Sequence, residues 1–408
     1  MGIYLDSVPS SGIIRIRDMM FAVKNPFRLD QGDVSFDAPD SVKAGMIRAI
    51  AENMSHYVQT TGLPRLQELI AAKLRRQNGV PIGSPAEILV TNGGVHALYL
   101  VFQALLEPGD EVILPDPQWP QTAGAIIAAH GAPVRCPLHE SLGWRPEVDE
   151  IAAQITPRTR AIYVNSPHNP TGGVLTRRDV ERIAGLARER RLWLVSDEAY
   201  EDVLFEGEHV CPASLPGMYG RTVPVYTFSK TYAMTGLRLG YVAVAEPKLR
   251  ERMVKILALT ASNVCSVVQL GGIAGLEGPQ DVVEQYRQEL LARRDLFYAG
   301  VGALGGVLSG QPPRGAFYAF LRIDPEWKAR APRLDAGPAE GAVAGGTPGS
   351  TSWEMAEYLI RCGRVGNIPG VDFGPAGEGH LRFCFARDRS ELAGALEAMR
   401  GLFTAKRA

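Results

Sequence analysis

Lys230 is the residue of this chain best placed to form a covalent bond, because it follows an apolar run in the segment Thr-Phe-Ser-Lys at residues 227–230. The alternation of apolar with small residues before it predicts a strand over residues 223–228. An isolated ammonium group is costly to bury and tends to lose its proton, so a lysine at the buried end of a strand becomes a neutral amine. Such an amine is a nucleophile that can form a Schiff base with a carbonyl compound.

Groups that suit a phosphate surround this lysine. Thr227 and Ser229 contribute hydroxyls, and Arg238 contributes a guanidinium group. An Asn-Gly-Gly turn at residues 92–94 leads into a predicted helix, whose free N–H groups also favour a phosphate. A Schiff-base lysine beside a phosphate site is the combination expected for pyridoxal 5′-phosphate. Taken alone, each of these segments is also compatible with an ordinary surface turn.

Further polar or aromatic groups stand where other predicted strands end. The carboxylate of Asp197 can hold a protonated pyridine nitrogen or simply cap a helix. Asn169, in the segment Asn-Ser-Pro-His-Asn-Pro-Thr-Gly, offers an amide to a ligand oxygen, although an ordinary turn has the same composition. Arg382 alternates with apolar neighbours, so it points inward toward a carboxylate or lies on an exposed sheet face. Trp119 stacks on a flat ring or belongs to the core.

The elements that must position these groups alternate between strand and helix. Predicted strands cover residues 87–90, 111–114, 159–165, 192–196, 223–228 and 238–245, and predicted helices between them cover 95–106 and 177–189. Alternation of this kind builds a parallel sheet with right-handed crossovers, and such apolar strands are buried on both faces. Ligands of these sheets bind beyond the carboxyl ends of the strands.

Two predicted helices, over residues 41–54 and 65–77, precede the first of these strands. After residue 248 the pattern turns helical, with predicted helices over 249–259, 267–276, 281–304, 352–362 and 389–403 and predicted strands over 316–323 and 380–386, and this α+β segment predicts a second, smaller domain. Residues 13–23 have a mixed pattern. We expect a large α/β domain over residues 46–290 and a small domain built from residues 1–45 and 291–408. Residues 331–352 are rich in Ala, Gly and Pro, which predicts a mobile loop.

The composition is that of an ordinary globular enzyme. With 408 residues, 46% apolar and 21% charged, the chain is long enough for two or three domains. The formal charge of −1 gives no general electrostatic attraction to nucleic acid or to an anionic membrane. The five cysteines form no Cys-x-x-Cys pair, which favours free thiols in a reducing compartment, and no run approaches a membrane span. We therefore expect a cytoplasmic protein.

Two other patterns carry no function. Residues 300–305 match Gly-x-Gly-x-x-Gly but follow a predicted helix, whereas a dinucleotide site requires a preceding strand. The seven histidines are dispersed without metal-ligand spacing, so no metal site is predicted.

Taken together, the motifs resemble those of the fold-type I pyridoxal-phosphate aminotransferases, specifically the class I and II group with the aspartate, aromatic and methionine aminotransferases. The resemblance extends from Gln-Gly-Asp at residues 31–33 to Leu-Arg-Phe at residues 381–383. It implies a large domain with a mostly parallel central sheet flanked by helices, a smaller α+β domain, and bound pyridoxal 5′-phosphate. The implied reaction moves an amino group between an L-amino acid and a 2-oxo acid.

The resemblance also implies a role for each matching residue. Lys230 would be the Schiff-base lysine and proton carrier, Asp197 would pair with the pyridine nitrogen, and Trp119 would stack on the ring. Asn169 and Tyr200 would bond the phenolic oxygen of the cofactor. The groups that hold the phosphate would be those of Gly93, Gly94, Val95, Thr227, Ser229 and Arg238.

Arg382, with Gly32 and Asn169 nearby, would bind the α-carboxylate of the substrate. Tyr57, in the pattern Tyr-x4-Gly, looks like the tyrosine that reaches the phosphate of the neighbouring subunit, which implies a homodimer with shared sites. One segment departs from the family: Gly-Asp-Val-Ser-Phe at residues 32–36 replaces the usual Gly-Glu-Pro-Asp-Phe, so we expect this segment to close differently over the site.

Two alternatives remain open from the sequence. A pyridoxal-phosphate lyase or decarboxylase uses the same fold, because the bond that breaks depends on which one stands perpendicular to the ring. An effector-sensing transcription regulator would also need a DNA-binding helix-turn-helix, for which the sequence offers no basic region. The sequence assigns no second arginine to a substrate side chain and so leaves the amino acid open.

Overall fold

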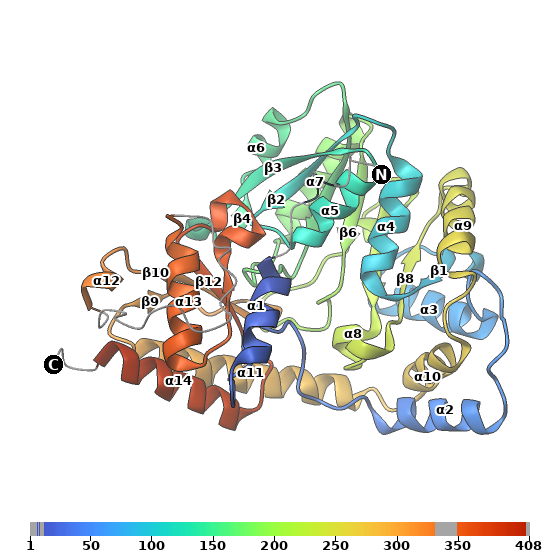
Figure 1. Cartoon of the computed structure of the whole chain (residues 1–408). Coiled ribbons are helices and arrows are strands. Elements are labelled where there is room, and N and C mark those ends of the chain that lie inside the picture. Colours follow the sequence, from blue (N-terminus) through green and yellow to red (C-terminus); the bar gives the residue numbers. More distant parts are fainter. Residues whose placement is uncertain (1–5, 7, 9–11, 331–348, 405–408) are drawn as a thin grey trace.

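The computed structural model describes residues 6, 8, 12–330 and 349–404 (Figure 1). Its centre is an eight-stranded sheet with the order β1-β8-β7-β6-β5-β2-β3-β4. The strands are β1 (Ile88–Thr91), β2 (Glu111–Asp116), β3 (Ala132–His139), β4 (Arg145–Pro146), β5 (Thr159–Asn165), β6 (Trp193–Asp197), β7 (Thr222–Thr227) and β8 (Gly240–Ala243). The five strands from β7 through β6, β5 and β2 to β3 run parallel, while β8, β1 and β4 pair antiparallel. The predicted fold class, a mostly parallel sheet between helices, is confirmed.

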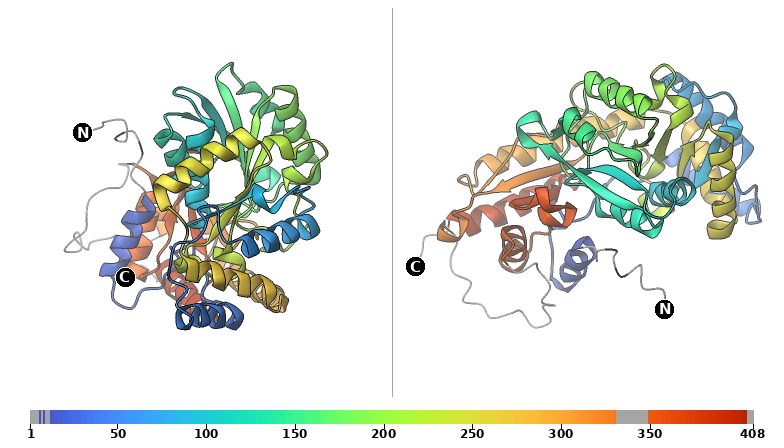
Figure 2. Two further views of the ribbon diagram at one scale, coloured as in Figure 1. Left: turned by 90° about the vertical axis from the view of Figure 1, so that its right-hand side faces the viewer. Right: turned by 90° about the horizontal axis from the view of Figure 1, so that it is seen from above.

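Both faces of this sheet are covered by helices (Figure 2). Because successive residues of a strand point to opposite faces, Tyr163 of β5 packs in one apolar core while Ile162 and Val164 pack in another. The first core receives α4 (Gly93–Leu105), α5 (Pro120–Ala128) and α9 (Pro247–Ala261). The second receives α6 (Val148–Ala153) and α7 (Arg177–Glu189). This double burial explains why the central strands are almost continuously apolar.

A smaller antiparallel sheet has the order β11-β12-β10-β9. Its strands are β9 (Leu308–Ser309), β10 (Tyr318–Ile323), β11 (Ile368–Pro369) and β12 (His380–Cys384). Phe297, Leu359 and Phe383 belong to one core that joins this sheet to α11 (Asp281–Gly302), α13 (Thr351–Gly363) and α14 (Arg389–Thr404). Further α-helices are α2 (Asp40–Ala51), α3 (Pro64–Gln77), α8 (Phe228–Thr231), α10 (Ser266–Glu277) and α12 (Trp327–Arg330).

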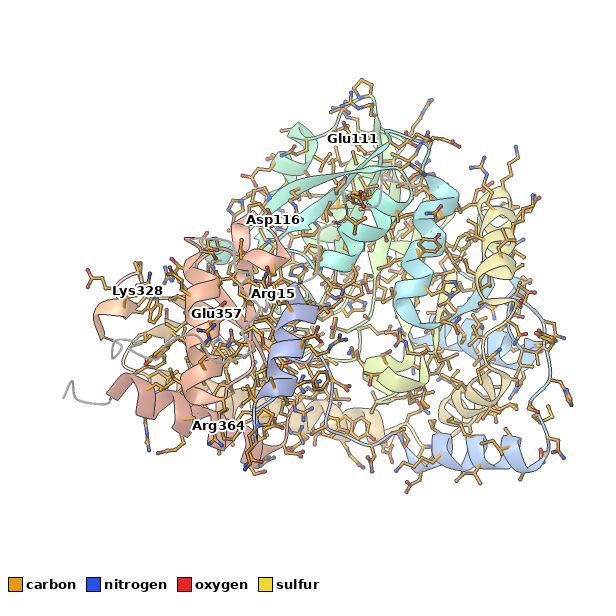
Figure 3. All side chains as sticks on the ribbon, viewed as in Figure 1. Arg15, Glu111, Asp116, Lys328, Glu357 and Arg364 are labelled. Carbon is orange, nitrogen blue, oxygen red and sulfur yellow. The ribbon has the colours of Figure 1, made fainter. Side chains whose placement is uncertain are left out.

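The segment with the mixed pattern is a helix, α1 (Gly12–Ala22), and it packs against the smaller sheet (Figure 1). Ile16 and Met20 are fully buried in the core that contains Trp353. The guanidinium carbon of Arg15 lies 3.5 Å from the centre of the Trp353 ring, and Figure 3 shows Arg15 beside α13. The periodicity of α1 was obscured because its apolar residues divide between this core and more exposed positions such as Ile14 and Phe21.

Some predicted boundaries were wrong. Arg238 does not begin a strand: it ends a short 3₁₀ turn with φ of 56°, and β8 starts at Gly240. No element was predicted from the sequence where α5, β3, β4 and α6 lie. Most of the predicted mobile loop, residues 331–348, lies outside the described residues, and α13 begins within the rest of it, at Thr351.

The division into two domains stays a prediction. The helix α11 continues through residue 290, so a boundary between residues 290 and 291 would fall within one helix. Among the helices of the described residues, none combines the length and the apolar content that crossing a bilayer requires.

Candidate active site

A cavity of about 420 Å³ lies where β5, β6 and β7 end. Asn165 at the end of β5 is in register with Asp197 at the end of β6, so neighbouring strands present these side chains at one level. Twelve of the sequence-predicted residues line the cavity: Gly32, Gly94, Val95, Trp119, Asn169, Asp197, Tyr200, Thr227, Ser229, Lys230, Arg238 and Arg382. The cavity is large enough to hold a flat phosphorylated ring together with an amino acid.

Lys230 lies in α8, the single turn of helix that follows β7. Its Nζ donates a hydrogen bond of 2.6 Å to the carbonyl oxygen of Gly32. Burial lowers the pKa of Lys230 to about 8, an effect that Asp33 opposes and that Arg382 and Arg238 reinforce. Near pH 8 a large fraction of this amine is therefore neutral, as the sequence predicted for a nucleophile and proton carrier.

The depressed pKa of Lys230 predicts a pH-dependent stability. The unfolded chain keeps this proton up to its ordinary pKa of 10.5, so between pH 8 and 10.5 it binds more protons than the folded chain, and stability rises with pH. The full effect is roughly 3 kcal/mol. Urea unfolding of the cofactor-free chain should therefore show Lys230→Met more stable than the wild type at pH 7, with the gap closing toward pH 10.5. A gap that stayed constant with pH would contradict the depressed pKa.

Asp197 is buried at the end of β6 and faces the cavity. Its Oδ2 accepts a hydrogen bond of 2.8 Å from the hydroxyl of Tyr163, and its Oδ1 accepts one of 3.1 Å from the backbone N–H of Ala199. Burial raises the pKa of Asp197 to about 6, whereas the two donors lower it and the neighbouring Glu198 raises it. A buried carboxylate of this kind fits a cationic partner in the cavity, such as a protonated pyridine nitrogen.

Arg382 enters the cavity from β12 and is 2% exposed. Its guanidinium group donates a hydrogen bond of 3.1 Å to Oδ1 of Asn169 and one of 2.8 Å to the carbonyl oxygen of Asp30. Its Nε has no acceptor among the described residues. Neither of these acceptors carries a charge. A buried guanidinium group with an unused donor is suited to an anion such as a carboxylate. The same contact commits the oxygen of Asn169, which leaves the amide nitrogen to donate to a ligand.

Tyr318 of β10 connects several cavity residues, although the sequence did not single it out. Its hydroxyl lies 2.7 Å from that of Tyr200. A Cβ atom on Gly32 would come within 2.5 Å of the same hydroxyl, so only glycine permits this approach. The alternation of apolar residues around Tyr318 indicated a strand but could not show which face met the cavity.

The residues expected to hold a phosphate converge at the start of α4. Thr227 Oγ1 accepts a hydrogen bond of 3.1 Å from the N–H of Ser229, and their hydroxyls lie 2.8 Å apart. A Cβ atom on Gly93 would come within 2.4 Å of Nη2 of Arg238, so glycine lets the guanidinium group lie against the helix start. A Cβ atom on Gly94 would make an ordinary van der Waals contact with Thr227, at 3.8 Å. Hydroxyls, a guanidinium group and a helix start that line one cavity fit a phosphate.

Tyr57 lies apart from this cavity. Its side chain is 87% exposed and borders a separate hollow with residues that include Ser266 and Asn263. Within one chain the structure therefore does not bring Tyr57 to the other predicted residues. An exposed tyrosine in this position is compatible with a contact in a second chain.

Several cavity residues were missed by the sequence analysis. Ile13 and Arg17 reach the cavity from α1, and Asp33 lies beside Gly32. The helix itself was not predicted, so nothing in the sequence could place its residues at the cavity. Within residues 12–330 and 349–404, no three His, Cys, Asp or Glu side chains gather as a metal would require.

Comparisons with known proteins agree with this arrangement. The family model described as aminotransferase class I and II matches residues 24–399. The chain is 35% identical to an aspartate aminotransferase of Pyrococcus abyssi, covering 99% of this chain and 98% of that protein. It is 36% identical to an aspartate/prephenate aminotransferase of Thermus thermophilus, covering 90% and 89%. The solved aspartate aminotransferase of Thermus thermophilus with maleate superposes with a TM-score of 0.87 at 32% identity, covering 98% of this chain and 99% of that one.

Proposed function

Because this chain belongs to the class I and II aminotransferase family, we propose that its cavity binds pyridoxal 5′-phosphate and moves an amino group between an L-amino acid and a 2-oxo acid. The observation that carries the proposal is the position of Lys230. An amine with a pKa lowered to about 8 lies in one cavity with a phosphate-binding cradle, a buried carboxylate and a buried arginine.

Each part of the cavity would hold one part of the cofactor. The N–H groups at the start of α4, with the hydroxyls of Thr227 and Ser229 and the guanidinium group of Arg238, would hold the phosphate. Asp197 would pair with the pyridine nitrogen, and Trp119 would lie against the ring. The amide nitrogen of Asn169 and the hydroxyl of Tyr200 would donate to the phenolic oxygen. When bound, the cofactor supplies an electron-withdrawing ring that stabilises the charge left on the substrate Cα.

The chain itself supplies substrate binding and proton transfer. Arg382 binds the α-carboxylate of the substrate, because its buried fork has donors without a charged partner. Binding at that end fixes the Cα relative to Lys230. The neutral Nζ of Lys230 takes the proton from Cα, and a pKa near the working pH suits an amine that must both accept and return it. The hydrogen bond to Gly32 holds the amine in place before substrate enters.

The two alternatives have less support. The relatives reported above are named as aminotransferases, and the match covers nearly the whole of each chain. None of these relatives is named as a lyase, a decarboxylase or a transcription regulator.

An absorbance titration tests the proposed function directly. The purified chain, saturated with pyridoxal 5′-phosphate, is mixed with single amino acids, with aspartate, glutamate, phenylalanine and tyrosine first. We expect the visible band of the bound cofactor to give way to that of its aminated form, and a 2-oxo acid to restore it. Failure of every amino acid, or release of carbon dioxide or a side-chain fragment as the main product, would contradict the proposal.

We also propose that the enzyme is a homodimer in which Tyr57 of each chain completes the phosphate site of the other. Support comes from the exposure of Tyr57 and of neighbouring apolar side chains on α2, Ile47 and Ile50, which are 67% and 64% exposed. Mixing unfolded Tyr57→Ala and Lys230→Ala chains and refolding them together should give activity well above the sum of the two separate variants. Among the dimers that these two variants can form, only the hybrid has a complete site, in which the Tyr57→Ala chain supplies Lys230 and the Lys230→Ala chain supplies Tyr57. No gain on mixing, or a monomer by sedimentation, would refute the shared site.

A further inference from the structure

A chain of hydrogen bonds runs from Asp197 into the protein, away from the cavity. The hydroxyl of Tyr163 lies 2.8 Å from Asp197 Oδ2, and Nε2 of Gln118 lies 3.3 Å from the Tyr163 oxygen. Nε2 of His168 lies 2.9 Å from Oε1 of Gln118, and the hydroxyl of Thr171 lies 2.8 Å from Nδ1 of His168. All five side chains are buried.

The orientation of the Gln118 amide, whose Nε2 donates to Tyr163 and to Thr122, sets the direction of the other links. The Thr171 hydroxyl accepts the N–H of Gly173, so its own hydrogen is available for Nδ1 of His168. A neutral imidazole that accepts at Nδ1 must donate at Nε2, which places Oε1 of Gln118 as the acceptor and directs its amide N–H toward Tyr163. A tyrosine oxygen that already receives a hydrogen bond directs its single hydrogen to Asp197.

The protonation states of His168 and Tyr163 agree with hydrogen bonds that all point toward Asp197. Burial lowers the pKa of His168 to about 3, so the imidazole is neutral at any working pH and keeps one donor and one acceptor. Burial and the nearby carboxylate hold the pKa of Tyr163 well above its ordinary value, so its hydroxyl keeps its hydrogen. The carboxylate at the end of the chain is therefore met by a donor that cannot ionise or turn away.

We propose that Tyr163 is a positioning residue for amino transfer, whose hydroxyl, oriented through Gln118, His168 and Thr171, holds Asp197 ionised and aimed at the pyridine nitrogen. The inference rests on the proposed function, because it assumes that this nitrogen is the partner of Asp197. Physically, a hydrogen bond to the charged form of a buried carboxylate opposes the protonation that burial favours. Removing the donor therefore lets Asp197 become neutral at a higher pH.

Other charged groups also face Asp197, and they stay in place in the test. Glu198 follows it in the chain and lies 2.6 Å from Nε2 of His209. On the neighbouring strand β7, the residue in register with Asp197 is the apolar Val225. The titratable side chains that share the cavity with Asp197 are Arg17, Asp30, Asp33, Tyr200, Lys230, Arg238, Tyr318 and Arg382.

The test measures the affinity of the full-length, cofactor-free chain for pyridoxal 5′-phosphate from pH 5 to pH 8, by fluorescence or absorbance titration. In Tyr163→Phe we expect the acid-side loss of affinity to move up by about one pH unit, which is about tenfold weaker binding than wild type at pH 5. At pH 8, where Asp197 is ionised in both proteins, the affinities should agree within about threefold. The cofactor's own titrations are common to both proteins and cancel in the ratio.

Two further variants separate this role from a general effect on packing. Tyr219→Phe removes an equivalent hydrogen bond, 2.8 Å from the Tyr219 hydroxyl to Glu87 Oε2, outside the cavity, and its affinity profile should match wild type. Gln118→Leu leaves Tyr163 in place but frees its hydrogen to turn, and should shift the profile in the same direction by about half a pH unit, or about threefold at pH 5. If Tyr163→Phe fails to fold, Gln118→Leu decides.

The outcomes separate the inference from the proposed function. A wild-type chain that binds no pyridoxal 5′-phosphate overturns the proposed function and the inference with it. A wild-type chain that binds it while the Tyr163→Phe profile is unchanged, or is weakened equally at every pH, overturns the positioning role alone. A Gln118→Leu profile identical to wild type would overturn the oriented chain.

Discussion

Replacing Lys230 with alanine is expected to lower the rate of amino transfer by about 10²- to 10⁴-fold, the range for loss of a general acid–base. Nζ of Lys230 is the amine in the cavity whose pKa burial lowers to about 8, and it is held 2.6 Å from the Gly32 carbonyl oxygen. The side chains proposed to hold the phosphate and the ring remain in Lys230→Ala. The variant should therefore still retain pyridoxal 5′-phosphate after desalting, measured by absorbance, while single-turnover rates with amino acids collapse.

Two variants control this result. Lys230→Arg keeps a positive charge and a long side chain but stays protonated at any working pH, so it should be as inactive as alanine. Lys255→Ala removes a lysine that is 68% exposed and pairs with Glu251, and should leave the rate unchanged. A Lys230→Ala enzyme that kept more than about a hundredth of the wild-type rate would refute the role of this amine, since a positioned acid–base contributes at least about 10²-fold.

The second large effect is expected at Arg382. Replacing it with glutamine should lower kcat/KM for the amino acid by about 30-fold to several thousand-fold, because truncating one partner of a buried charge pair costs about 2–5 kcal/mol. The kcat/KM of Arg382→Lys should lie between those of the wild type and Arg382→Gln, since a lysine keeps the charge but loses the planar fork that pairs two donors with a carboxylate. The assay is steady-state kinetics with the best amino acid found in the absorbance titration.

Selectivity gives a sharper test than rate. An amine that lacks the α-carboxylate cannot use Arg382, so its much lower kcat/KM should be nearly the same in wild type and Arg382→Gln. Arg293→Gln provides a matched control, because Arg293 is also buried, at 5% exposed, but lies on α11 and pairs with Glu289. That variant should lose stability while keeping the preference for the amino acid. Equal losses for the amino acid and the amine in Arg382→Gln would contradict carboxylate binding.

Much of the candidate site could be predicted because its parts are local patterns. The apolar strand before Lys230, the glycines before α4 and the prolines around Asn169 each occupy a few adjacent residues. Strand and helix periodicity extends over similar lengths, so the alternation of the large domain could also be predicted from order alone. The prediction of a strand starting at Arg238 was wrong because Arg238 has an αL conformation, which ends the extended pattern. The helix α1 was not predicted because its apolar residues are divided between core and exposed positions.

The amino-acid sequence by itself determined which chemical groups this protein has: one lysine after a buried strand, carboxylate and amide groups at strand ends, and a glycine turn before a helix. Only the tertiary structure decided which of them meet. The contact of Lys230 with Gly32 joins residues 198 positions apart, and that of Arg382 with Asn169 joins residues 213 apart. The hydrogen-bond chain behind Asp197 likewise depends on which face of β5 carries Tyr163. Periodicity reports whether a side chain is buried, but its partner is fixed by how distant segments pack, and that information lies in no single stretch of the chain.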